Sequence, residues 1–158
     1  MSYINWKELL TVGGVIASLV FVGLEISQNT SATRGQTRTE LAALNQEWLF
    51  LISNPEINTN FGRMWILNDE ENMDAMEINQ ANLLMISNIR RLENVYYQYE
   101  EGLVDESALD SYGFQTNTLL FEGEAFSHWW FNLGNKEIFH PDFVQLFESK
   151  IGLSASET

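Results

Sequence analysis

The sequence has no cysteine, only two prolines and two histidines, and few basic residues. Without cysteine the chain forms no disulfide and offers neither a thiolate nucleophile nor the sulfur ligands of zinc sites. Two histidines leave little material for acid–base or metal chemistry, so we expect no enzyme, no cofactor and no metal. The formal net charge of −14 repels phosphate groups, which argues against nucleic acid as a partner.

What the chain does have is apolar and aromatic residues. Hydrophobic residues make up 45% of its 158 positions and aromatic residues 13%. That composition supports a packed core, and the length suits one compact domain with an appended element.

Residues 9–24 form a run of sixteen without a charged side chain. A helix that crosses a membrane needs about 20 apolar residues, with about 17 as the lower limit, and Trp6 and Ile26 extend the run to that length. We therefore favour a membrane span over a buried core or oligomer-core helix. A cleaved signal peptide is disfavoured for two reasons. The charges of the flanking Lys7 and Glu8 cancel, so the basic region of a signal peptide is missing, and no small-x-small cleavage site follows.

Small residues recur within this run at four-residue spacing. They form two pairs, and the two members of each pair lie on the same helical face: Gly13 with Ala17, and Gly14 with Ser18. Such faces let two helix backbones approach closely in lipid, so we expect a homo-oligomer packed through them. Glu25 would lie at the membrane edge, and in a ring of helices its carboxylates would surround the mouth of a pore.

The charge pattern gives a domain organisation and an orientation. We expect a transmembrane anchor over residues 1–28, an acidic helical domain over 29–152 and a flexible tail over 153–158. Lys7 precedes the span, whereas Arg34 and Arg38 follow it, which favours a cytoplasmic C-terminal domain. The predicted location is a membrane, with the lipid bilayer as the main partner.

The remaining sequence reads as all-α, because apolar residues recur at helical spacing and no strand-like alternation appears. The first stripe is Leu41, Leu44, Trp48 and Leu51, on a helix that continues the span with a kink in 29–35. Further helices are expected over residues 55–66, 74–101, 105–121, 124–133 and 141–151. Asn54 and Asp105 suit helix caps, Gly102, Gly134 and Gly152 suit helix stops, and Leu109, Tyr112, Leu119 and Leu120 are expected in the core.

Two polar patterns suggest metals but are incomplete. Glu124 and His128 share a helical face without a further ligand, so a structural histidine is the favoured interpretation. The acidic run over residues 69–77 lacks the glycine that an EF-hand loop needs, so we favour a solvated linker and helix start over calcium.

The most distinctive patch of the domain is "IRRLENVYYQYEEG". It places Arg90, Arg91, Glu93, Tyr96 and Tyr97 on one helix. The arginines and tyrosines could form a pocket for an anionic ligand, which is the alternative function of a ligand-binding or sensory domain. Internal pairing with Glu93, Glu100 or another helix is the favoured explanation.

Three stretches carry a family resemblance: "IASLVFVGLEISQNTSATRGQT", "RRLENVYYQYEEGLVDE" and "FHPDFVQLFES". With them the chain resembles a group of short, uncharacterised bacterial proteins. The resemblance implies an N-terminal apolar helix, a polar Gln-Asn-Thr continuation and a small helical domain, and it implies no established activity. It also implies a bacterial origin, so the expected membrane is a bacterial inner membrane. This chain departs from the group in having Ser27 and Ser31 where basic residues are expected.

Overall fold

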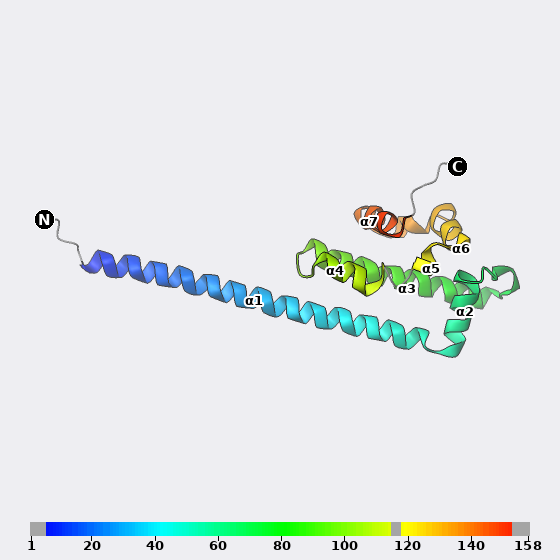
Figure 1. Ribbon diagram of the computed structural model, residues 1–158, viewed down its shortest axis with the longest axis horizontal. Coiled ribbons are helices and arrows are strands. Elements are labelled where there is room, and N and C mark those ends of the chain that lie inside the picture. The colour runs from blue at the N-terminus through cyan, green and yellow to red at the C-terminus, as the bar shows by residue number, and fades with distance from the viewer. Residues whose placement is uncertain (1–5, 115–117, 153–158) are drawn as a thin grey trace.

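The computed structural model describes residues 6–114 and 118–152, apart from the side chains of residues 8, 113, 114, 118 and 119. Across these residues the chain is helical and contains no strand, which confirms the all-α class. The first element, α1 (Trp6–Ile52), is one helix of 47 residues, about 70 Å long at 1.5 Å per residue (Figure 1).

The helix α1 shows no break where a kink was expected. Residues 29–35 are α-helical throughout, so the predicted kink is wrong as a change of secondary structure. No proline lies in α1, and a single internal glycine such as Gly35 costs a helix only about 1 kcal/mol. The boundary expected between residues 28 and 29 therefore falls inside a continuous helix.

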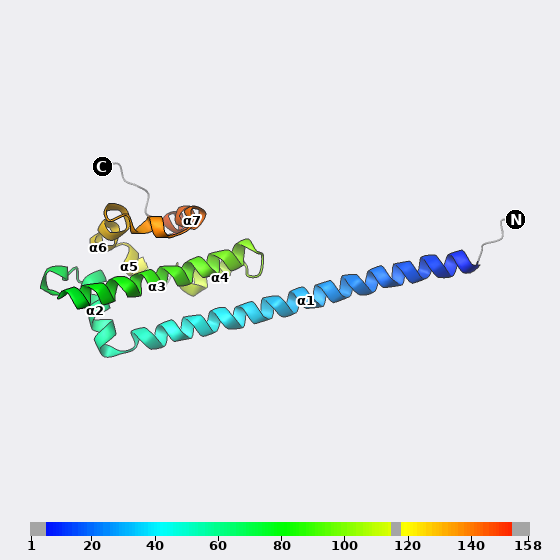
Figure 2. The same ribbon diagram turned by 180° about the vertical axis from the view of Figure 1, so that it is seen from behind.

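After α1 the chain reverses direction. The short helix α2 (Pro55–Trp65) and the 3-10 turn η1 (Glu70–Asn72) lead into α3 (Ala75–Glu100), which runs back along the second half of α1 (Figures 1 and 2). As predicted, the Asn54 side chain caps α2, and Asp74 forms a reciprocal capping box with Glu77 at the start of α3. Gly102, with φ of 69°, follows the end of α3.

The rest of the chain forms short helical segments around α3. They are α4 (Glu106–Leu109), η2 (Asp110–Phe114), α5 (Thr118–Phe121), α6 (Glu124–Ser127), η3 (His128–Asn132), η4 (Asn135–Ile138) and α7 (Pro141–Ile151). Where one helix was predicted over residues 105–121, the structure has α4, η2 and α5. His140 caps α7, and Gly134 and Gly152 have positive φ. The predicted tail lies outside the described residues.

The core is built largely from aromatic rings. Trp65, Phe126, Trp130, Phe143 and Phe147 are all fully buried. The ring centroids of Trp130 and Phe147 are 5.0 Å apart, and those of Phe126 and Trp130 are 5.7 Å apart. Both tryptophans of the "HWWF" segment, Trp129 and Trp130, are buried in this core. Of the other expected core residues, Leu109 is buried, Tyr112 and Leu120 are half-buried, and the side chain of Leu119 is not described.

Only the second half of α1 packs against the other helices. Thr37, Leu41 and Trp48 are buried, whereas every described side chain of α1 before Thr37 is exposed. The predicted apolar stripe is partly wrong, because Leu44 and Leu51 stay 41% and 39% exposed. These two leucines lie beside the contact with α3 and line a cavity there. The molecule thus has a helical head, comprising residues 37–152, and a projecting helix.

Candidate functional site

The apolar part of α1 is not covered by any other described part of the chain. Its most apolar 18-residue window has a mean hydropathy of 2.2, and none of that window is buried. Leu19 and Phe21 expose 67% and 70% of their surface. Burying such side chains is favourable by roughly 1.5–3 kcal/mol each, so a bare apolar helix in water is costly. By length and composition, this helix could cross a membrane.

The predicted packing residues lie on this exposed helix. Gly13, Gly14, Ala17 and Ser18 are all exposed, and a Cβ atom built on either glycine would meet no atom within 4 Å. The fold of the single chain therefore does not require glycine at these two positions. Glu25 is also exposed, near the end of the apolar run.

Arg90 is paired internally, as the favoured explanation predicted. Its guanidinium forms an ion pair with Glu93, donates to the Ile138 carbonyl at 2.7 Å and lies 4.7 Å above the ring of Phe139. Glu93 is only 3% exposed, and it also accepts the backbone N–H of His140 at 2.8 Å. The network thus joins α3 to the start of α7 and leaves the charge of Arg90 compensated.

The two tyrosines belong to this structural network and its surroundings. Tyr96 is buried, with its ring 5.8 Å from that of Phe143, and burial raises the pKa of its hydroxyl. Tyr97 donates to Glu93 at 3.4 Å, and partial desolvation, together with the nearby Glu93 carboxylate, raises its pKa. Neither tyrosine lines the cavity beside Arg91.

Arg91 points the other way, toward α1. It donates to the side-chain oxygens of Asn45 at 2.8 Å and Asn88 at 3.0 Å, and to the Tyr112 carbonyl. None of these acceptors carries a charge, and among the described residues Arg91 has no carboxylate partner. Burial of this uncompensated cation lowers the pKa of Arg91 to about 10.

The hydrogen bonds of Arg91 are incomplete as well. A guanidinium has five N–H donors, and three of them have acceptors here. The Nε atom is buried without an acceptor, and Nη2 has one acceptor for its two hydrogens. A buried donor without a partner costs about 1–3 kcal/mol. The donors of Arg91 without an acceptor are therefore the Nε–H and one N–H of Nη2.

A cavity of about 370 Å³ lies between α1 and α3 at this arginine. On the α1 side it is lined by the apolar side chains of Leu44, Trp48 and Leu51, and on the α3 side by polar groups that include Arg91 and Asn94. Small-molecule sites commonly combine an apolar wall with a few polar groups in a volume of this order.

Sequence reasoning missed Asn45 and Asn88, which hold the Arg91 guanidinium in place. Asn45 follows Leu41 by four positions, and Asn88 lies between Met85 and Leu92 on the buried face of α3. A polar residue inside an apolar helical stripe is the signal that could have indicated them, because a buried amide needs a polar partner.

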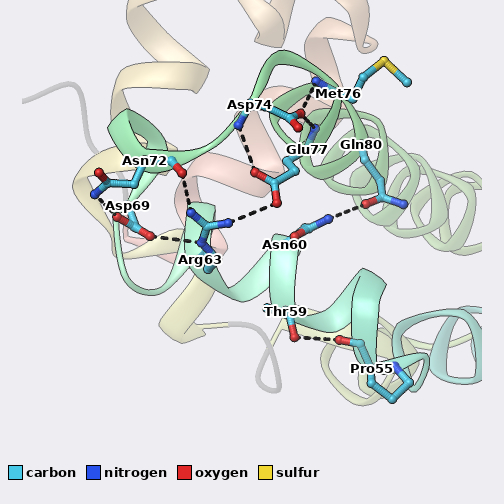
Figure 3. Close-up of polar contacts among 10 residues, drawn as sticks. All are labelled: Pro55, Thr59, Asn60, Arg63, Asp69, Asn72, Asp74, Met76, Glu77 and Gln80. Carbon is cyan, nitrogen blue, oxygen red and sulfur yellow. Dashed lines mark hydrogen bonds and ion pairs between the residues drawn. The ribbon is translucent and has the colours of Figure 1, made fainter.

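Two carboxylates of the acidic run, Asp69 and Glu77, contact Arg63 of α2 (Figure 3). Arg63 donates to Asp69 at 3.0 Å, to Glu77 at 3.1 Å and to the Asn72 carbonyl at 2.7 Å. The hydrogen bond from Asn72, followed by that from Arg63, lowers the pKa of Asp69, while the bond to Asp69 raises the pKa of Arg63. Among the described residues no group of three acidic or histidine side chains is placed to hold a metal. The run therefore fastens α2 to α3.

The Glu124–His128 pair lies at a second cavity of about 420 Å³, which Asn82 and Trp129 also line. The Nδ1 atom of His128 is 2.9 Å from the side-chain nitrogen of Asn132, and His128 is exposed. The histidine thus has a local hydrogen-bond partner on its own helical segment.

Comparison with known proteins finds no matching family, no similar curated protein and no similar solved structure. The resemblance to short bacterial proteins therefore stays a prediction, and function has to be argued from this chain alone.

Proposed function

We propose that this is a non-enzymatic, single-pass protein of a bacterial inner membrane, anchored by α1 and carrying a cytoplasmic helical head. The observation that supports the anchor is the complete exposure of the apolar window of α1 beside a head that has its own aromatic core. A core helix would be covered by the chain that it stabilises. Lipid supplies the apolar surroundings that the protein does not.

The dimensions of α1 suit this arrangement. Residues 6–26 extend about 30 Å as a helix, which matches the hydrocarbon thickness of a bilayer. Residues 27–36 add about 15 Å of exposed polar helix before the first buried side chain of the head, Thr37. The head would therefore be held away from the headgroups on a helical stalk, defined here as residues 27–36.

Membrane fractionation tests the anchor. After a carbonate wash at high pH, the full chain is expected in the membrane pellet, because the apolar helix cannot be extracted by breaking electrostatic contacts. Recovery in the soluble fraction would overturn the anchor and any pore built on it.

Self-association through the small-residue face is the second part of the proposal. Because Gly14 has no neighbour within the chain, Gly14→Leu should leave the single chain folded and obstruct close helix packing. Gly23 lies nine residues later, about 180° around the helix, and is equally free of neighbours, so Gly23→Leu is the matched control.

The measurement is the mass of the detergent-solubilised protein over a dilution series. Wild type and Gly23→Leu are expected to form an oligomer, whereas Gly14→Leu should dissociate at a concentration at least about tenfold higher. A wild-type monomer at every concentration would exclude both the oligomer and the pore with Glu25 at its mouth.

A further inference from the structure

We propose that the cavity between α1 and α3 binds a small organic monocarboxylate, with its carboxylate on Arg91 and its apolar part against Trp48. The cavity belongs to the head and not to the apolar end of α1. The proposal therefore stands whether or not α1 crosses a membrane.

Charge is the first argument. Arg91 is a largely buried cation whose three acceptors are two amide oxygens and a backbone carbonyl. The other arginine at the cavity, Arg90, is already compensated by Glu93. Arg91 thus has no ion-pair partner among the described residues, and the carboxylate of a ligand would supply one.

Donor geometry is the second argument. Arg91 lines the cavity, and two of its donors, the buried Nε–H and one N–H of Nη2, have no acceptor within the described residues. Ser87 and Asn94, from the preceding and the following turn of α3, also line the cavity and can donate hydrogen bonds. An acceptor-only ligand group is therefore complementary to this wall.

The opposite wall determines what the carboxylate is attached to. Leu44 and Leu51 line the cavity and are partly exposed there. The buried Trp48 lies between them along α1 and also lines the cavity. An aromatic or branched aliphatic body would cover these side chains. Acetate would leave them uncovered.

Glu47 makes the site selective. Its carboxylate also lines the cavity and is exposed to solvent. A dianion such as inorganic phosphate would meet this like charge, whereas a monoanion held at Arg91 would meet less repulsion. Removal of the Glu47 charge should strengthen binding of any anion in the cavity.

The test is calorimetric titration of the full chain, in nanodiscs of phosphatidylcholine, with four probes: benzoate, benzamide, acetate and inorganic phosphate. Benzoate is expected to bind, with benzamide, acetate and phosphate each at least about tenfold weaker. Titration of empty nanodiscs corrects for partition of benzoate into lipid.

Three variants locate the site. Arg91→Gln should weaken benzoate binding at least about tenfold, while Glu47→Gln should tighten it about threefold. Arg38→Gln removes an equal charge from an exposed position of α1 and should leave binding unchanged. Because Glu47 makes no hydrogen bond or ion pair among the described residues, Glu47→Gln reports on the cavity even if Arg91→Gln fails to fold.

Several results would overturn the proposal. Equal binding of benzamide would show an apolar cavity without recognition of charge, and preferred binding of phosphate would show the wrong anion class. Absence of benzoate binding to wild type, or insensitivity to both Arg91→Gln and Glu47→Gln, would place no carboxylate in this cavity. Burial of Trp48 against a second copy of the chain would identify the cavity as a protein interface.

Discussion

Glu93 shows how a charged residue becomes part of the interior of the head. It is almost completely buried, yet it has the Arg90 guanidinium, the His140 backbone N–H and the Tyr97 hydroxyl around it. The bond to His140 is made where α7 begins, so a side chain of α3 holds the start of α7 in place. Arg90 is half-exposed, so water can replace part of its interaction with Glu93.

We therefore expect Glu93→Ala to lower the free energy of unfolding by about 2–3 kcal/mol, mainly because it leaves a buried N–H without an acceptor. Glu93→Gln retains an acceptor oxygen and should lose about half as much. Urea unfolding followed by tryptophan fluorescence measures both. Equal losses for the two variants would indicate that the ion pair, and not the bond to His140, dominates.

Asp69 gives a prediction about acid stability. Its ordinary pKa of 3.8 is lowered in the folded state by Asn72 and Arg63. A carboxyl group with a lowered folded pKa stabilises the fold above its unfolded pKa, and this contribution is lost as the pH falls through the lower, folded value. The relevant window therefore lies at and below about pH 4.

Asp69→Asn should accordingly destabilise the protein at pH 6, and the difference from wild type should shrink as the pH is lowered from about 5 to 2. Thermal unfolding at several pH values measures this. Glu71→Gln removes a neighbouring exposed carboxylate and serves as the control. A difference that stays constant with pH would contradict a role for the Asp69 charge.

At the scale of elements, α1 has two halves that depend on different surroundings. The described side chains of residues 6–36 are exposed, whereas the part from Thr37 to Ile52 contributes Leu41 and Trp48 to the core. A helix is stabilised mostly by packing of its apolar face. The two halves should therefore respond differently to the same disruption.

A proline in each half tests this difference. Ala32→Pro should break the stalk and leave the melting temperature of the head within about 2 °C of wild type, because no packing is lost there. Ala42→Pro, within the packed half, should destabilise the head by about 3 kcal/mol or more. Near-ultraviolet circular dichroism follows the aromatic core during melting. Equal destabilisation by the two prolines would show that the stalk supports the head.

At the scale of the whole molecule, α1 is the one connection between the apolar end and the head within the described residues. Because the aromatic core lies entirely in the head, a chain lacking residues 1–28 should fold, remain in the soluble fraction and sediment as a monomer. Analytical ultracentrifugation and near-ultraviolet circular dichroism check this. Aggregation of the truncated chain, with loss of the aromatic signal, would show that the apolar end of α1 stabilises the head.

Local chemistry made much of this fold predictable. Asn54 caps α2 as expected, and Gly102 follows the end of α3, because capping and helix termination depend on neighbours in sequence. Asp105 stands at the expected cap position of α4, but its side chain makes no capping hydrogen bond. Trp129 and Trp130 lie in the core because large apolar side chains are costly to leave in water. Leu44 and Leu51 could not be placed in this way, because periodicity gives the face of a helix and not how much of it a partner covers.

The sequence by itself determined the helical class, the length of the apolar run and the positions of the caps, since each depends on interactions within a few residues. Only the tertiary structure decided that Arg90 is neutralised by Glu93 while its neighbour Arg91 is turned toward α1 without a carboxylate. Adjacent residues on a helix point about 100° apart, so two arginines side by side in the chain meet different packing partners. Which of them keeps an uncompensated charge depends on those partners, and these come from distant parts of the chain.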